Sequence, residues 1–325
     1  MLQLFFIKSV RWVLGLVWLA LSGVVLAQTN ANQPITLIIP YPPGGSADML
    51  ARPMLPDLQK VLGQTIVLDY KGGAGGTIAT SALARAKPDG QTIILILTAH
   101  AINDALYPTL PYNTRKDFAP VSLVATLPLL VAAPLSSPFN TIPELIAYAK
   151  ANPDKLSYAS AGNGNTSHLS VELFKTQTGT KMVHIPYKGS GPAVIAMLGN
   201  EVSVMFDSIS TSFQQVKAGK LKAIAVSSLE RAAILPNTPT IAETLPGFEI
   251  TVWYGILAPA GTPEAAISKL SQAFAQVGAD PKVRAQLAES GYATVGSTPA
   301  AFGKHIDAEL IKWSKAVKDS GATIQ

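Results

Sequence analysis

Four short glycine-rich segments constrain the fold more than any other feature of the sequence, because each lies where a strand-like apolar run gives way to a helical pattern. They are PPGGSAD (42–48), GGAGGT (72–77), GNGNTSH (162–168) and KGSGP (188–192). Apolar strands that alternate with helices are typical of a parallel sheet with helices on both faces. In such folds these junctions lie at the carboxyl ends of the strands, where ligands bind. The sequence therefore predicts an α/β fold with a cleft shared by the four loops.

The strand and helix patterns fall into two series, which we expect to form two similar α/β units. Strand-like runs of the first series lie at 35–41, 65–70 and 92–98, and those of the second at 129–134, 156–161, 182–187, 202–207 and 221–228. A strand-like run at 251–260 precedes three helical patterns, near 263–278, 281–290 and 298–319. In the helix after the first loop, Pro53 and Pro56 are expected to kink or split the chain.

The first 27 residues have the composition of a secretory signal peptide. Lys8 and Arg11 precede an apolar stretch that ends in Val25-Leu26-Ala27. A basic start, an apolar middle and small residues before the cleavage point are the marks of such a peptide. A membrane anchor is the alternative, because the apolar stretch approaches bilayer-spanning length. The Val-x-Ala ending favours cleavage, and we therefore expect a periplasmic protein that begins at Gln28.

Composition argues against several classes of protein. The chain is 48% apolar and 14% charged, which disfavours disorder. Of its 25 basic residues, Lys8 and Arg11 belong to residues 1–27, so the mature chain would carry 23 basic and 20 acidic residues, a net charge of +3. It has no lysine- or arginine-rich run, so we expect no nucleic-acid partner. It has no cysteine, which leaves no disulfide and no thiol chemistry.

The glycine loops are suited to binding an anion. Glycine lets a backbone approach a ligand closely and adopt positive φ, and the amides that open a helix have no partner within it. A carboxylate or phosphate can therefore be held by backbone amides, here with help from Ser46. No loop has the Gly-Lys-Ser/Thr of a nucleotide-binding P-loop or the third glycine of a dinucleotide fingerprint. The other interpretation is that these are ordinary turns in which Ser46 or Thr166 caps a helix.

Catalytic motifs are absent from the sequence. There is no Gly-x-Ser-x-Gly, no His-Glu-x-x-His and no ligand-like pairing among the four histidines. His184 lies in a strand-like run and reads as a packed core residue, whereas His100 and His168 lie near the loops and are candidates for ligand contact. We interpret Asp48 as an acidic residue in the first turn of a helix rather than as a catalytic group. Asp207 ends an apolar run, and two roles stay open for it: a structural hydrogen-bonded carboxylate, or a group that faces the cleft.

Taken in order, several stretches resemble one known family. YPPGGSADMLAR, KGGAGGTIATSALARAKPDGQTI, LSYASAGNGNTSHLSVELF, HIPYKGSGPAVIAMLGNEVSVMFD, GKLKAIAVSS and WYGILAPAGTP are similar to the Bug family, the extracytoplasmic solute receptors of tripartite tricarboxylate transporters. The resemblance implies an α/β, two-lobed periplasmic-binding-protein fold with a mostly parallel sheet in each lobe and a ligand cleft between them. Residues 28–130 with 245–325 would form one lobe and residues 131–244 the other, which replaces the two sequential units.

The resemblance also implies the ligand site and the partners. Residues expected to bind a carboxylated ligand, often through ordered waters, are Tyr41, Pro42, Gly44, Gly45, Ser46, Gly76, Thr98, Ala161, Asn163, Asn165, Thr166, Tyr187 and Asp207. The protein would deliver a small organic carboxylate, such as a di- or tricarboxylate or an aromatic acid, to integral-membrane transporter subunits. It would act as a monomer with no metal, no cofactor and no enzymatic activity. The alternatives are a sensor receptor without its own permease and, more remotely, a hydrolase or transferase that uses Asp207 or His168.

The sequence also departs from the family pattern. LDYKGGAGG replaces the Glu-Asn-Arg-Pro that commonly precedes the second glycine loop, and Tyr41 stands where many members carry phenylalanine. The ligand therefore does not follow from the resemblance.

Overall fold

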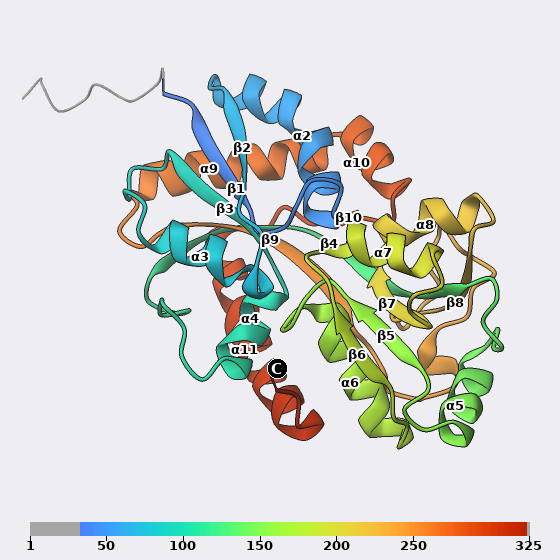
Figure 1. The fold of residues 1–325 in the computed structure, drawn as a ribbon. Helices are drawn as coiled ribbons and strands as arrows, with labels where there is room; N and C mark the ends of the chain where they lie inside the picture. The colour runs from blue at the N-terminus through green and yellow to red at the C-terminus, as the bar shows by residue number, and fades with distance from the viewer. Residues whose placement is uncertain (1–32, 324–325) are drawn as a thin grey trace, which may run out of the picture. The chain divides into compact units, whose positions relative to one another are not determined.

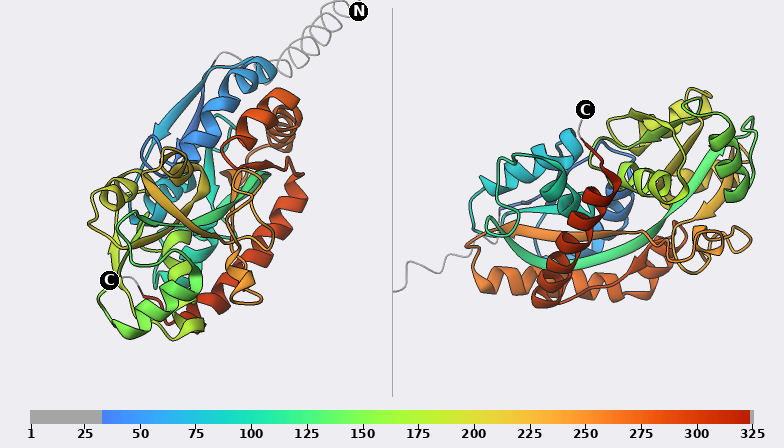
Figure 2. Two further views of the ribbon diagram at one scale, coloured as in Figure 1. Left: turned by 90° about the vertical axis from the view of Figure 1, so that its right-hand side faces the viewer. Right: turned by 90° about the horizontal axis from the view of Figure 1, so that it is seen from below.

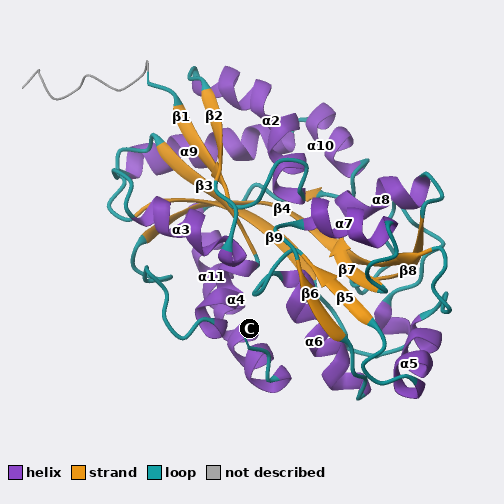
Figure 3. Cartoon of the chain, viewed as in Figure 1, coloured by secondary structure: helices purple, strands orange, loops and turns teal. Residues whose placement is uncertain are grey.

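The computed structural model describes residues 33–323, and the chain from Pro34 onward forms one compact unit. The predicted signal peptide, 1–27, lies outside the described residues. Strands and helices alternate along most of the unit, as the patterns predict, and helices pack around the strands (Figures 1 and 3). No helix among the described residues is long and apolar enough to cross a membrane.

The first half of the sheet is built around β1 (Ile35–Ile39). This strand pairs in parallel with β2 (Ile66–Tyr70) on one side and with β3 (Thr92–Leu97) on the other. The helices that connect these strands are α2 (Ser46–Leu62) and α3 (Thr77–Ala84), with a short 3-10 turn, η2 (Ala74–Gly76), before α3. All three strands end toward the glycine loops 42–48 and 72–77 and toward α4 (Ala99–Leu106), a helix that the sequence patterns did not indicate.

Two long strands connect the halves of the sheet. β4 (Phe118–Pro134) pairs antiparallel with β9 (Thr251–Pro259) as far as Pro128 and then, from Leu129, with β7 (Val204–Ser208) and β8 (Leu221–Val226). β9 also pairs antiparallel with β3, and β10 (Ala293–Thr294) pairs with β4. Figure 2 shows β4 running from one half of the unit to the other.

The second half repeats the parallel arrangement of the first. β5 (Ser157–Ser160) lies between β6 (Val183–Pro186) and β7, parallel to both. Its helices are α5 (Ile142–Ala151), α6 (Thr166–Thr178), α7 (Ser190–Leu198) and α8 (Ile209–Lys217). The predicted two-lobed α/β fold is confirmed, but each sheet is mixed rather than mostly parallel, because β4 and β9 run against their neighbours.

The C-terminal segment returns to the first half and crosses toward the second. It contains the 3-10 turn η3 (Ile241–Glu243) and, after β9, helices α9 (Glu264–Ala279), α10 (Pro281–Ala288) and α11 (Pro299–Ser320). Helix α9 packs on α2, whereas α11 packs on α4, β4 and α6. The buried Glu309 of α11 accepts hydrogen bonds from the indoles of Trp253 (2.7 Å) and Trp313 (2.8 Å), which fixes this helix against β9.

Helix α2 is continuous through both of its prolines, so the expected split is wrong. Pro53 and Pro56 remove two intrahelical hydrogen bonds. Pro56 is exposed and Pro53 is half-buried, whereas Leu50, Met54 and Leu58 are almost fully buried. Burial of this apolar face stabilises the helix by more than the lost hydrogen bonds cost.

Candidate functional site

Three of the four glycine loops, 72–77, 162–168 and 188–192, line a cavity of about 420 Å³ between the two lobes, and Tyr41 lines it just before the first loop. The first lobe contributes residues from the loops after β1 and β2 and from the end of α4, and the second lobe contributes residues from the loops after β5 and β6. The lining residues are Tyr41, Gly73, Ala74, Gly75, Tyr107, Ala161, Gly162, Asn163, Pro186, Tyr187 and Lys188. The cleft expected from the positions of these loops is therefore present.

A smaller inner pocket, of about 10 Å³, lies where several helices begin. Ser46, Thr166 and Ser190 are the first residues of α2, α6 and α7, and all three line it. Ser208, the residue before α8, lines it too, together with Tyr41, Gly45, Leu97, Ala161, Asn165 and Val252. Four helix N-termini thus converge on one polar pocket. Each brings amides without an intrahelical partner and the positive end of its dipole.

Tyr41 joins the two lobes across the site and lines both the large cavity and the inner pocket. Its hydroxyl accepts a hydrogen bond from Asn165 Nδ2 (2.9 Å) and donates to the carbonyl of Gly75 (3.3 Å). The same carbonyl accepts from Asn103 Nδ2 (3.0 Å). Burial raises the pKa of Tyr41, so its hydroxyl stays protonated as a donor. The lobes are therefore in direct polar contact through Tyr41, just before the first glycine loop, and Asn165 in the third.

Glycine is required where the lobes touch. Gly75 has φ +61°, and a Cβ there would lie 2.5 Å from the carbonyl oxygen of Asn163 in the opposite lobe. Gly164 has φ +77°, and a Cβ there would lie 2.4 Å from Asn103 Oδ1. Both distances are shorter than any real Cβ contact. The absence of side chains at these two positions is what lets the loops approach each other this closely.

Asp48 fixes the first loop instead of facing a ligand. Its Oδ2 accepts from the amide of Gly44 (2.8 Å), and its Oδ1 accepts from Tyr70 and from Arg52 Nε (2.8 Å). Burial on its own would raise the pKa of Asp48, but the bonds from Tyr70, Gly44 and Arg52 outweigh it and hold the pKa below its usual value. The carboxylate is thus ionised and fully used in holding the loop, which agrees with a first-turn structural acid.

The electrostatics of the site favour an anion. Among the described residues that line the large cavity and the inner pocket, none is acidic, and Lys188 supplies a cation at the large cavity. The described part of the chain contains no group of three or more His, Cys, Asp or Glu side chains that could hold a metal. Amides, hydroxyls and one ammonium group are therefore the means by which this site can bind a ligand.

Nine of the thirteen predicted site residues line these cavities. Tyr41, Ala161, Asn163 and Tyr187 line the large cavity; Gly45, Ser46, Asn165 and Thr166 line the inner pocket; and Gly76 lines a third, similarly small pocket beside Tyr41. Gly44 holds Asp48, as described above, and Pro42 packs against Gly72 and Gly189. Thr98 is fully buried and accepts a hydrogen bond from the amide of Trp253 (2.9 Å). Pro42, Gly44 and Thr98 therefore line none of the three cavities and instead support the residues that do.

Asp207 is fully buried and lines none of these cavities, although its neighbour Ser208 lines the inner pocket. Its Oδ2 accepts from Thr211 and from Ser212 Oγ (2.6 Å), both on α8, while its Oδ1 has no hydrogen-bond partner among the described residues. Burial raises the pKa of this carboxyl, and hydrogen bonding from Ser212, Thr211, Ser190 and the Ser208 backbone counteracts only part of the shift. Of the two roles left open by the sequence, the geometry matches the structural one.

The histidines also lie outside the large cavity. His100 packs against Tyr112 and Phe118 and lines the third, small pocket, and burial lowers its pKa to about 4. His184 Nε2 lies 2.6 Å from Ser160 Oγ, which is the spacing of a nucleophile and a base. Ser160, however, is fully buried and lines none of the three cavities, so its hydroxyl has no access to a ligand bound there.

Sequence reasoning missed several lining residues. Gly73, Ala74 and Gly75 belong to a loop that was recognised, but only Gly76 was expected to contribute. Lys188 and Ser190 lie in the KGSGP loop at the start of α7. Their position beside a helix N-terminus was the signal that could have identified them. Tyr107 follows α4 and Val252 lies in β9, and neither segment carries a loop signal.

The sequence is similar to a known protein family and to its curated members. Residues 50–322 match the family described as "Tripartite tricarboxylate transporter family receptor". A UPF0065 protein from the tcbD-tcbE intergenic region of Pseudomonas sp. strain P51 is 36% identical, over 91% of this chain and 92% of that protein. Protein BugT of Bordetella pertussis is 34% identical, over 95% of this chain and 97% of that protein.

Several solved structures are also similar to this chain. Periplasmic binding protein BugD is 37% identical with a TM-score of 0.86, covering 90% of this chain and 99% of that one. Rpa4515 of R. palustris, solved with adipate, is 35% identical with a TM-score of 0.88, covering 91% and 99%. MatC of Rhodopseudomonas palustris, solved with bound malate, is 32% identical with a TM-score of 0.85, covering 89% and 99%. The chain belongs to the tripartite tricarboxylate transporter receptor family and is a receptor of the Bug type.

Proposed function

We propose that this protein captures a small organic carboxylate in the cleft between its lobes and delivers it to a tripartite tricarboxylate-type membrane transporter. The observation that carries the proposal is the convergence of the N-termini of α2, α6, α7 and α8 on one pocket without an acidic side chain. Backbone amides and helix dipoles at such a point stabilise a negative charge without a cationic side chain. The two relatives solved with adipate and malate bind acids of this class.

The shape of the site favours an acid with a second polar group. One carboxylate would be held by the amides and hydroxyls around Ser46 and Thr166, after the inner pocket, now about 10 Å³, widens to admit it. The rest of the ligand would occupy the large cavity, where the Lys188 ammonium and the hydroxyls of Tyr107 and Tyr187 are available to a second carboxylate or a hydroxyl. The cavity volume of about 420 Å³ lies within the range of small-molecule sites. We therefore propose a dicarboxylate or hydroxy acid as ligand class.

A panel of organic acids tests this function. We expect adipate, malate or a related di- or tricarboxylate to raise the melting temperature, because ligand at a hundred times its Kd adds about 2.7 kcal/mol to the stability of the folded state. Esters of the same acids are the matched controls, since they keep the shape and lose the charge. Equal shifts with acids and esters, or no shift with any acid in thermal melts and calorimetry, would contradict the proposal.

We propose that the protein works in the periplasm after removal of residues 1–27. The basic start, apolar middle and Val-x-Ala ending of that segment support export followed by cleavage. We expect intact-mass spectrometry of a periplasmic extract to give a chain that begins at Gln28. A chain that retains Met1 and partitions with membranes would instead favour the anchor.

We propose lobe boundaries at 28–130 with 245–325, and 131–244. They are supported by the change of partner along β4, which pairs with β9 through Pro128 and with β7 from Leu129. The return to the first lobe is supported by β9, which begins at Thr251. Closure of these lobes around the ligand, in a monomer, would present the liganded form to the membrane subunits.

A further inference from the structure

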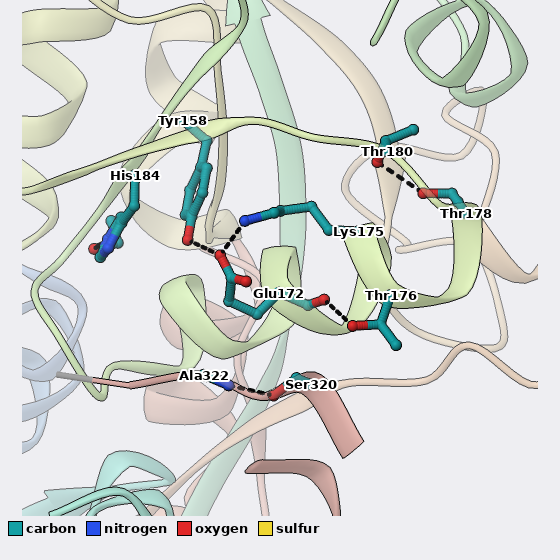
Figure 4. A network of polar contacts seen from close by, with 10 residues as sticks. Tyr158, Glu172, Lys175, Thr176, Thr178, Thr180, His184, Ser320 and Ala322 are labelled. Atoms are coloured by element: carbon teal, nitrogen blue, oxygen red, sulfur yellow. Dashed lines mark hydrogen bonds and ion pairs between the residues drawn. The ribbon is translucent and has the colours of Figure 1, made fainter. Parts of the chain in front are cut away.

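Two histidines that line none of the three cavities are stacked behind the third glycine loop. The rings of His168 on α6 and His184 on β6 lie 4.1 Å apart between centroids and 6° from parallel. The ring of Tyr158 on β5 continues the stack, 4.7 Å from His184. Figure 4 shows His184 beside Tyr158, with Glu172 and Lys175 of α6 next to them. The three rings therefore form one stack.

Each histidine reaches one glycine amide of that loop. His168 Nδ1 accepts a hydrogen bond from the amide of Gly164 (3.4 Å). His184 Nε2 lies 2.6 Å from Ser160 Oγ, and the same hydroxyl accepts from the amide of Gly162 (3.2 Å). One ring thus holds Gly164 directly, and the other holds Gly162 through Ser160.

The loop needs such support because its two glycines have unusual backbone angles. Gly162 has φ +124° and Gly164 has φ +77°, and glycine has the largest conformational freedom of any residue. Between and after them lie Asn163 and Asn165, which line the large cavity and the inner pocket. Support for the two glycines therefore fixes the backbone on both sides of Asn163, whereas Asn165 is held in addition by the Tyr41 hydroxyl and the Ser167 amide.

The environment keeps both rings neutral at neutral pH. Burial lowers the pKa of His168 to about 4, and Lys175 adds to the effect while Glu172 opposes it. Burial lowers the pKa of His184 to about 3, with further contributions from His168 and Lys175. Glu172 is itself held by Tyr158 (2.5 Å) and by Lys175 (2.7 Å), as Figure 4 shows. The Nδ1 atom of neutral His168 is free of a proton and can accept from Gly164.

We propose that His168 is a positioning residue of the carboxylate site: its ring holds Gly164, the stacked His184 holds Gly162 through Ser160, and together they preorganise loop 161–165. The inference rests on the proposed function, since it assigns the loop to ligand binding. It adds a role for a pair of side chains that never touch the ligand. Protonation of His168 places a hydrogen on Nδ1, which removes the acceptor for Gly164.

Two substitutions at His168 separate the hydrogen bond from the stack. His168→Phe keeps an aromatic ring against His184 and removes the acceptor, so we expect adipate or malate affinity to fall about fivefold to tenfold with little change in melting temperature. His168→Asn keeps an oxygen near the position of Nδ1 and removes the ring. It should recover most of the affinity while the melting temperature falls by about 3 °C. His305→Phe, in a separate cluster with Trp253 and Phe302, is the control and should leave affinity unchanged.

A pH profile gives a second readout. Between pH 6 and 4 the affinity of the wild type should fall relative to His168→Asn, because only the wild type gains a proton at this position. The protonation of the acid itself is common to both proteins, so the ratio of the two affinities isolates the histidine. A ratio that stays constant with pH would overturn the proposal.

Hydrogen exchange tests the inference without a ligand. The Gly164 amide should lose its protection in His168→Phe and keep it in His168→Asn. If the wild type binds no acid of the panel, the proposed function fails while this measurement still decides the role of His168. Equal protection in the two variants, or affinity that follows melting temperature in both, would show that the stack is only part of the core.

Discussion

Gly75→Ala is expected to weaken carboxylate binding by about tenfold to a hundredfold. The added Cβ would lie 2.5 Å from the carbonyl oxygen of Asn163, which belongs to the backbone of the opposite lobe and has little freedom to move. Overpacking of this kind typically costs about 1–3 kcal/mol. Here the cost falls on the closed form, because the two loops meet only when the lobes are together. Isothermal titration calorimetry with the best acid of the panel measures the effect.

Gly179→Ala is the matched control for the backbone strain. Gly179 ends α6 with φ +66° and ψ +25°, close to the φ +61° and ψ +18° of Gly75, but a Cβ there meets nothing within 4 Å. Both variants should lose about 1 kcal/mol of unfolding free energy from the left-handed conformation. Only Gly75→Ala should lose affinity. If both variants bind like the wild type, the contact between Gly75 and Asn163 is not part of the liganded state.

Thr166→Asp is expected to reduce binding at least a hundredfold. Thr166 is 2% exposed and lines the inner pocket at the start of α6. Two like charges about 4 Å apart repel by about 4 kcal/mol at an effective dielectric constant of 20. A carboxylate at this position would also occupy the helix N-terminus in place of the ligand. Calorimetric titration and competition with chloride would measure the loss.

Thr166→Asn separates charge from size in this experiment. Asparagine has nearly the same shape as aspartate and no charge, so we expect at most a fewfold loss of affinity. Aspartate in the first turn of a helix is favourable by about 0.3–1 kcal/mol, so the charged variant should still fold. If Thr166→Asp binds as tightly as Thr166→Asn, the anion does not lie at the convergence of helix N-termini, whatever the outcome at Gly75.

The loops of the site were predictable from sequence because glycine content and position are local signals. The segments 42–48, 72–77, 162–168 and 188–192 all follow strands, and each lines the large cavity or the inner pocket. What could not be predicted is which atoms meet across the lobes. Asn165 and Tyr41 are separated by 124 residues, and their hydrogen bond follows from tertiary packing alone.

The first part of β4 was missed because its sequence violates the usual strand pattern. Pro120 and Pro128 interrupt the apolar run, and a proline normally argues against a strand in the middle of a sheet. The strand accommodates Pro120 with irregular pairing to β9, between Pro120 and Ser122 and again between Leu123 and Ala125, whereas Pro128 lies at the last pair with β9, where the strand changes partner. Such bulges leave no sequence signal that distinguishes them from a loop.

The sequence left Asp207 undecided between a structural role and a position facing the cleft. A carboxylate at the end of an apolar strand next to glycine loops is often exposed to a ligand. Here Thr211 and Ser212 follow in the first turn of α8 and turn their hydroxyls back toward it. Thr211 and Ser212, four and five positions after Asp207, were the sequence signal. Hydroxyl groups at this spacing can donate to the carboxylate and so indicate that it is a buried acceptor.

The central position of β9 also determines the order in which the chain can fold. β3 ends at Leu97 and β4 begins at Phe118, yet both pair with a strand that begins only at Thr251. Until that segment is available, the facing edges of β3 and β4 have unpaired backbone groups and apolar side chains. Pairings between residues so distant in sequence are slow to form, and open strand edges invite association with other chains. The nascent protein therefore passes through a long stage in which it depends on protection from aggregation, and a chain cut short before residue 251 has no complete first lobe to fold.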